Sequence, residues 1–205
     1  SMLEFFAKVV AISSSGALAP GPLSAATATI GVQKGWKGGF MVSLGHFVVE
    51  APIVFLIAFF VSLATIDALM KPLAILGGGM LILFGYLTIK SALSKERSKV
   101  KTNFNPFLTG VLLTALNPFF IAWWFSVGSM LVVDSTILFG SLGAVLLLAS
   151  HVWIDFAWLS LIAYLTSLKG IMEKFHRAIL FLLGLLVLFF GLDYLHFAFL
   201  NTHLI

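Results

Sequence analysis

Cysteine is absent from the 205-residue sequence, and charged residues make up only 10% of the chain. Without a thiol, the chain cannot form disulfides, bind a metal through thiolates or use a cysteine nucleophile. Soluble domains carry about 25% charged residues, so this shortage excludes a soluble globular enzyme and a disordered tail. The sequence is instead 60% hydrophobic and contains 21 phenylalanines. We therefore predict an integral membrane protein.

Six long apolar runs follow one another along the chain. Each is near or above the roughly 20 residues that a spanning helix needs. Continuous runs of this length favour helices over a membrane barrel, whose strands are short and alternate in polarity. We predict an all-α transmembrane domain of six helices within residues 1–205. The predicted spans are roughly 3–30, 38–63, 72–93, 106–133, 137–168 and 178–200.

The basic residues are distributed unevenly between the loops that join these spans. Ten of the twelve lysines and arginines fall in the loops after the first, third and fifth spans, and the densest group covers residues 90–101. The other side of the membrane has only Lys8 and Lys71. Basic residues accumulate in cytoplasmic loops, so both termini should be extracytoplasmic in a cell (plasma) membrane. The net charge of +4 then reflects the orientation of the chain in the membrane and does not indicate nucleic-acid binding. Binding of anionic lipid by the basic loops is a secondary role.

One pattern occurs twice and divides the chain into halves. Spans two and five share a histidine followed four residues later by an acid, at an offset of 105: His46 with Glu50, and His151 with Asp155. Paired glycines recur in spans three and six at an offset of 106, and Ala-Leu-x-Pro recurs in spans one and four at an offset of 98. Three spans per half predict an inverted repeat, as in many secondary transporters. Repeat 1 covers about 2–93, a cytoplasmic basic loop about 94–105, and repeat 2 about 106–200.

Proline interrupts the first and fourth spans at matching places. The interruptions are Pro20-Gly21-Pro22 and Asn117-Pro118. In lipid, backbone freed by such a break is tolerated only where it lines a cavity or is buried in protein. The amino end of the following half-helix also attracts anionic groups. A plain proline kink is the alternative, but the matched breaks favour a substrate site. Trp158 is the best candidate for its wall, because it shares a helix face with His151.

The four ionisable residues of spans two and five are the candidate coupling site. His46 and Glu50 are four residues apart and share one helix face, as do His151 and Asp155. Ionisable groups within a span are costly, and they usually face a cavity and pair with one another. One interpretation is that each histidine binds its own acid and only fixes the packing. The others are a proton relay and ligation of a metal cation.

The same residues carry a resemblance to a known family. The motifs are Ala19-Pro20-Gly21-Pro22, the glycines that continue to Gly39 and Gly45, and Asn117-Pro118. Together they resemble the lysine exporter (LysE/RhtB) family of amino-acid efflux transporters. Many members have an aspartate after the glycine at position 45, whereas His46 follows it here, and this resembles an archaeal-type subgroup. The resemblance implies proton-driven export of amino acids or similar small metabolites.

We therefore expect a secondary active exporter, an antiporter of small polar metabolites with amino acids as the first candidates. A divalent metal-ion exporter that uses His46, Glu50, His151 and Asp155 is one alternative, and a non-transporting membrane scaffold is another. The expected partners are the substrate, protons and membrane lipid, and a homo-oligomer is compatible with the sequence. No serine lies in a nucleophile-elbow pattern. We expect no enzymatic activity and no cofactor.

Overall fold

The computed structural model describes residues 1–18, 21–63, 66–94, 105–168 and 173–204. All regular structure in these ranges is helical, which agrees with the predicted all-α class. Pro20, the basic residues at 95–101 and Lys169 lie outside the described residues. The elements are α1 (Met2–Ala17), α2 (Pro22–Leu63), α3 (Ile66–Leu93), α4 (Pro106–Ala115), α5 (Pro118–Trp123), the π-helix η1 (Trp124–Gly128), α6 (Ser129–Phe139), the 3-10 turn η2 (Gly140–Leu142), α7 (Gly143–Ser167) and α8 (Glu173–Leu200).

Proline starts three of these helices. Pro22, Pro106 and Pro118 each occupy the first helical position, where proline loses no intrahelical hydrogen bond. Asparagine caps two of the three: the Asn105 side chain accepts from the Leu108 N–H at 2.7 Å, and the Asn117 side chain accepts from the Phe119 N–H at 3.0 Å. The predicted interruption of the fourth span therefore consists of a helix end at Ala115 and a capped restart at Pro118.

Glycines with positive φ turn the chain at two matching places. Within α2, Gly35 (φ 60°, ψ −155°) separates a helix at 22–34 from a second one at 36–63. Gly140 (φ 60°, ψ −135°) ends α6 and leads into α7. The predicted boundaries at 133 and 137 are wrong, because α6 continues to Phe139 and α7 begins only at Gly143. The two glycines are 105 residues apart, which is also the offset of the two histidine–acid pairs.

Close helix packing depends on glycines that face neighbouring backbone. A Cβ at Gly45 would collide with the Phe107 carbonyl, and one at Gly110 with the Val42 carbonyl, so α2 and α4 touch along their backbones. On α3 and α8, Gly78 faces Gly191 and Gly85 faces Gly184. These paired glycines therefore let α3 and α8 approach each other along their backbones.

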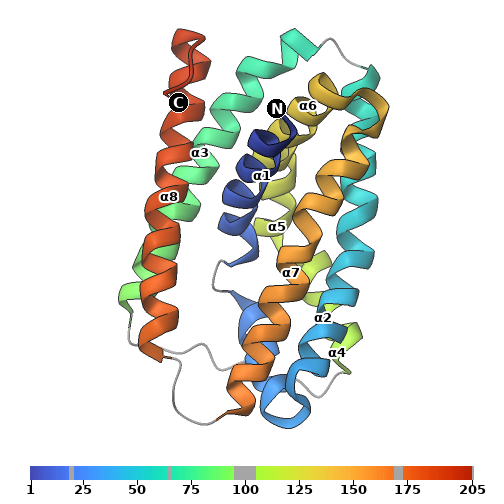
Figure 1. The fold of residues 1–205 in the computed structure, drawn as a ribbon, viewed down its shortest axis with the longest axis vertical. Helices are drawn as coiled ribbons and strands as arrows, with labels where there is room; N and C mark the ends of the chain where they lie inside the picture. Colours follow the sequence, from blue (N-terminus) through green and yellow to red (C-terminus); the bar gives the residue numbers. More distant parts are fainter. Residues whose placement is uncertain (19–20, 64–65, 95–104, 169–172, 205) are drawn as a thin grey trace.

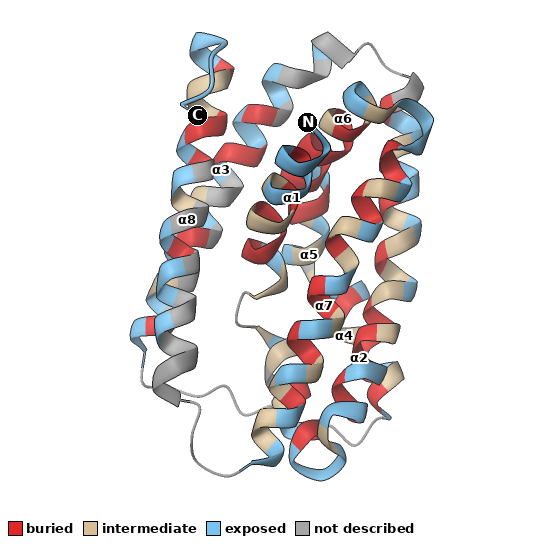
Figure 2. Cartoon of the chain, viewed as in Figure 1, coloured by how far each residue is buried: buried red, intermediate tan, exposed pale blue. Residues whose placement is uncertain are grey.

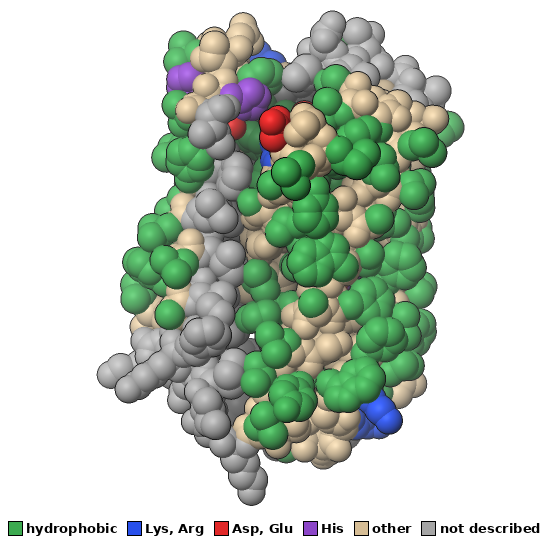
Figure 3. All heavy atoms as spheres, in the orientation of Figure 1, with side chains coloured by type: hydrophobic (Ala, Val, Ile, Leu, Met, Phe, Trp, Pro, Cys, Tyr) green, Lys and Arg blue, Asp and Glu red, His purple; other side chains and the backbone are tan. Residues whose placement is uncertain are grey.

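Both chain ends lie at one end of the molecule, called the terminal end below, and the Gly35 turn lies at the opposite end (Figure 1). In the described part of the chain, two helical stretches are long and apolar enough to cross a membrane, 22–61 and 119–167. Buried residues line the inner faces of α1, α2 and α7, and exposed ones face outward (Figure 2). Hydrophobic side chains cover much of the outer face seen in Figure 3. The fold thus has an apolar exterior and a packed interior.

Candidate functional site

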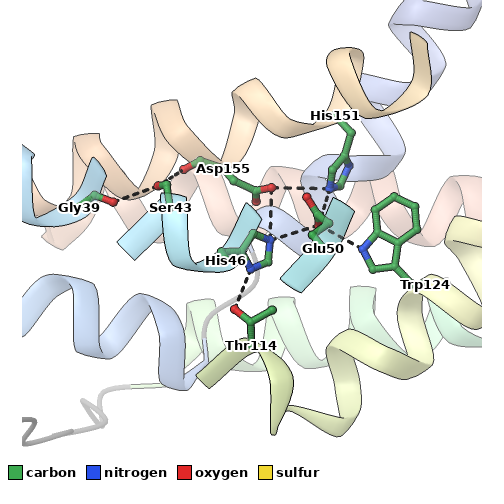
Figure 4. A network of polar contacts seen from close by, with 8 residues as sticks. All are labelled: Gly39, Ser43, His46, Glu50, Thr114, Trp124, His151 and Asp155. Atoms are coloured by element: carbon green, nitrogen blue, oxygen red, sulfur yellow. Dashed lines mark hydrogen bonds and ion pairs between the residues drawn. The ribbon is translucent and has the colours of Figure 1, made fainter. Parts of the chain in front are cut away.

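The two histidine–acid pairs meet where α2 packs against α7 (Figure 4). His46 and Glu50 lie one turn apart on α2, and His151 and Asp155 do the same on α7. All four side chains are nearly inaccessible, with 6%, 1%, 3% and 4% of their residue surface exposed, respectively. We call these residues the four-residue site.

The contacts within the site cross between the helices. Glu50 Oε2 lies 3.1 Å from His46 Nε2 and 3.0 Å from His151 Nε2. Asp155 Oδ2 lies 3.4 Å from His46 Nε2 and 3.6 Å from His151 Nε2. The interpretation in which each histidine binds only its own acid is therefore wrong, because His151 is closer to Glu50 than to Asp155.

Two further residues hold the site, and both come from the interrupted fourth span. The Trp124 indole N–H donates to Glu50 Oε2 at 3.1 Å, and Thr114 Oγ1 lies 2.9 Å from His46 Nδ1. Neither residue is among the site residues predicted from the sequence. The direction of the Trp124 side chain depends on the π-helix that begins at this residue. The sequence does not indicate a π-helix at this position. Thr114 could have been noted only for its place one turn before the break.

The buried carboxylates are incompletely satisfied. Among the described residues, Glu50 Oε1, Asp155 Oδ2 and His151 Nδ1 have no hydrogen-bond partner. A buried carboxylate without full compensation is costly. The site therefore favours the binding of ions or ligand groups that carry positive charge. Protons, a cationic ligand group and a metal ion all meet that requirement.

The donor set also suits a metal ion. One ligand atom from each of His46, Glu50 and Asp155 lies within 4.8 Å of the others. The nitrogen–oxygen separations of 3.0–3.6 Å around the site resemble the roughly 3.3–3.5 Å between two ligands of a tetrahedral ion with bonds of about 2.0–2.1 Å. Imidazole and carboxylate together fit a divalent first-row metal, and Thr114 would orient the His46 ring as an outer partner.

The predicted substrate residues lie around this site in different ways. Asn117 uses its side-chain oxygen as a helix cap, while Phe120, two residues after Pro118, contacts the His46 ring edge-on at a centroid distance of 5.2 Å. The second break is thus adjacent to the site. At the first break, Gly21 is half-buried and Pro22 is exposed.

Trp158 connects the first break to the site. It is buried in an apolar cluster with Ile30, Val42 and Leu159, and the partly buried Leu18 and Leu23 pack against that cluster. Leu18 and Leu23 stand on either side of the first break, and Trp158 follows Asp155 by three residues. Residues on both sides of the first interruption therefore pack against a cluster that contains Trp158, which lies about one helical turn from Asp155.

Long apolar helices and a buried ionisable centre are features expected of a membrane transport protein. The chain matches the model of the LysE type translocator family over residues 14–197. It therefore belongs to the LysE type translocator family, a family of integral membrane transporters and not of enzymes. A comparison with curated proteins gave no significant match, and a comparison with solved structures gave none. The predicted family is confirmed, whereas nothing in the comparisons supports the archaeal-type subgroup.

Proposed function

We propose that this translocator is a secondary active exporter of small polar metabolites, with amino acids as the first candidates, and that the proton gradient drives it. The observation that carries the proposal is the four-residue site. Two acids and two histidines from different halves of the chain meet in a buried place, next to the second helix interruption. Ionisable groups in such a position mark ion and substrate pathways in membrane proteins.

Glu50 is the centre of the proposed proton path. Its Oε2 atom lies within hydrogen-bond distance of both histidine Nε2 atoms, so a proton can pass between the helices through this carboxylate. Trp124 and Thr114 fix the orientation of the acceptor and of the His46 ring. Asp155, with longer contacts, is the second proton carrier. Proton release from the acids then leaves negative charge that attracts the cationic group of the next substrate.

We propose further that the chain crosses the membrane six times as two inverted repeats. The contacts of α3 and α8 support this, because a two-fold exchange of the repeats turns the Gly78–Gly191 contact into the Gly85–Gly184 contact. The same exchange turns the His46–Asp155 contact into the His151–Glu50 contact. Rocking of one half against the other would expose the site alternately to the two sides.

Flux in proteoliposomes tests the proposed coupling. Substrates are first selected by a thermal-shift screen of amino acids and metal ions, and labelled substrate is then followed under an imposed pH gradient. We expect Glu50→Gln and Asp155→Asn to abolish gradient-driven flux, because the amides cannot carry protons. The matched control is Glu4→Gln, since Glu4 is exposed on α1. Gradient-driven flux that survives in both site variants would show that the relay proposal is wrong.

Export of a divalent metal ion is the second candidate, favoured by the clustered ligand atoms of His46, Glu50 and Asp155. Elemental analysis of the purified protein separates the two candidates. If the purified protein carries stoichiometric metal, and if the His46→Ala variant loses it, the metal ion is the transported substrate. Absence of metal, together with flux of an amino acid, would leave the first proposal standing.

A further inference from the structure

A partly buried polar contact lies outside the four-residue site and joins the two interrupted spans. Lys8 of α1 and Asp134 of α6 form an ion pair with 2.8 Å between Nζ and Oδ2. The two side chains are only 29% and 19% exposed. Unlike the exposed pair of the N-terminus with Glu4, this contact connects residues far apart in the sequence. It is thus a tertiary connection between the halves, near the terminal end.

Tyr194 of α8 adds a third helix to this connection. The Lys8 ammonium lies 5.5 Å from the centre of the Tyr194 ring, within the range of a cation–π interaction. The Tyr194 side chain is fully buried, and its hydroxyl has no hydrogen-bond partner among the described residues. On the same pair of helices as the ion pair, Phe5 of α1 packs edge-on against Phe139 of α6 at 5.1 Å.

An apolar layer connects the ion pair to the four-residue site. One cluster of buried residues includes Phe5 and Val9, which flank Lys8 on α1, and also Tyr194 and Trp124. Trp124 in turn donates its hydrogen bond to Glu50. The layer is therefore continuous from the residues that flank Lys8 to Trp124 at the site, and a path that leads between these helices to the terminal end has to separate these side chains.

We propose that Lys8 and Asp134 form a latch that holds the path from the four-residue site to the terminal end closed, with Tyr194 fixing α8 against it. This inference rests on the proposed transport function, since only a transporter has to open that path. In apolar surroundings, the Lys8 ammonium and the Asp134 carboxylate are stable while they remain in contact with each other. Once separated, each charge requires water, so opening the latch and hydrating the path occur together.

Thiol accessibility tests the latch without a transported molecule. The chain contains no cysteine, so Thr114→Cys places a single thiol beside His46. A membrane-impermeant methanethiosulfonate reagent is applied to intact cells and to inside-out vesicles, and the rate of modification is measured. We expect Lys8→Ala or Asp134→Ala to raise the rate about tenfold in one of the two preparations, the factor that corresponds to about 1.4 kcal/mol.

Two control variants make the result specific to the pair. Lys71→Ala removes an exposed lysine at the start of α3 and should leave the rate unchanged. The charge-reversed double variant, Lys8→Asp with Asp134→Lys, should restore the low rate. Gel filtration and thermal unfolding check folding, and Lys8→Gln with Asp134→Asn replaces the alanine variants if these do not fold.

A modification rate that stays unchanged in both preparations when Lys8 or Asp134 is replaced would overturn the latch. A raised rate that the charge-reversed double variant does not lower again would also overturn it. Both outcomes are independent of gradient-driven flux. A negative flux experiment with a positive accessibility result would therefore remove the proposed coupling but leave the latch intact.

Discussion

Glu50 Oε2 receives three nitrogen contacts at the centre of the site, from His46, His151 and Trp124, while Oε1 has no hydrogen-bond partner among the described residues. One oxygen is thus fully engaged and the other is available. At the scale of single residues, this asymmetry gives Glu50 two tasks. Oε2 holds the two helices together, and Oε1 is the natural acceptor for an incoming proton or cation.

The contact between Thr114 and His46 yields a prediction about stability. Thr114→Val keeps the shape of the side chain but removes the hydroxyl that contacts His46 Nδ1. A buried group that loses its partner costs about 1–3 kcal/mol, so the unfolding temperature of the purified protein should fall. Thr136→Val is the control, because the Thr136 hydroxyl donates to the Val132 carbonyl of its own helix. Equal unfolding temperatures for the two variants would contradict the assigned role of Thr114.

The four ionisable residues could be predicted from the sequence, because charge is conspicuous within an apolar run. Their partners could not. Trp124 reaches Glu50 through the wider turn of a π-helix, and Thr114 reaches His46 because glycines let α4 approach α2. Neither the local winding of a helix nor the distance between two helices follows from the periodicity of hydrophobic residues.

At the scale of elements, the contact between α2 and α4 determines where His46 lies. Gly45 precedes His46 and faces the backbone of α4, while Gly110 faces the backbone of α2. Together they bring α4 near enough for Thr114 to bind the histidine. The spacing of these glycines is therefore part of the construction of the site.

Gly45→Ala should separate the two helices. Its new methyl group would collide with the Phe107 carbonyl, which is backbone and cannot rotate away. Overpacking of this kind costs about 1–3 kcal/mol, and flux should decline as His46 loses Thr114. The matched control is Gly79→Ala in α3, where a Cβ would meet nothing within 4 Å; its unfolding temperature should stay the same or rise, since alanine favours helix. An intact unfolding temperature in Gly45→Ala would refute the close contact.

The two turns at Gly35 and Gly140 give a further prediction. Both residues have φ of 60° with strongly negative ψ, a conformation that residues with a Cβ avoid. Gly35→Ala and Gly140→Ala should each lower the free energy of unfolding by about 1–3 kcal/mol, as measured by denaturation in detergent. Gly21→Ala serves as the control, because Gly21 has no positive φ and nothing lies near its Cβ position. Similar stabilities for all three variants would contradict a conformational requirement at the turns.

At the scale of the whole molecule, composition was enough to predict an all-α membrane protein. The ends of the elements were harder to predict, since apolar residues continue through the end of α6, and only Gly140 marks the turn. The convergence of both histidine–acid pairs depends on how α2 packs against α7. The sequence repeat indicates that the two pairs can meet, but it does not determine which acid each histidine contacts.

The common location of the two chain ends yields a prediction about topology. With a cysteine-free background, single variants Met2→Cys, Thr202→Cys and Lys37→Cys can each be treated with an impermeant maleimide on intact cells. Both terminal variants should be labelled and Lys37→Cys should not, because the termini share one end of the molecule and the Gly35 turn lies at the other (Figure 1). Labelling of Lys37→Cys alone would reverse the proposed orientation, and labelling of only one terminal variant would contradict the fold.

α1 ends at Ala17, and Trp123 holds its last turn. The Trp123 indole N–H donates to the Ser15 hydroxyl at 3.1 Å, and Gly16 lies against the same ring. Lys8 lies about two turns further out, roughly 11 Å along the axis. A swing of about 15° around the Ser15 contact would displace Lys8 by about 3 Å, enough to part it from Asp134. Such a rotation would also shift Phe5 and Val9 within the buried cluster that contains Trp124, so parting the ion pair would loosen the packing beside the four-residue site.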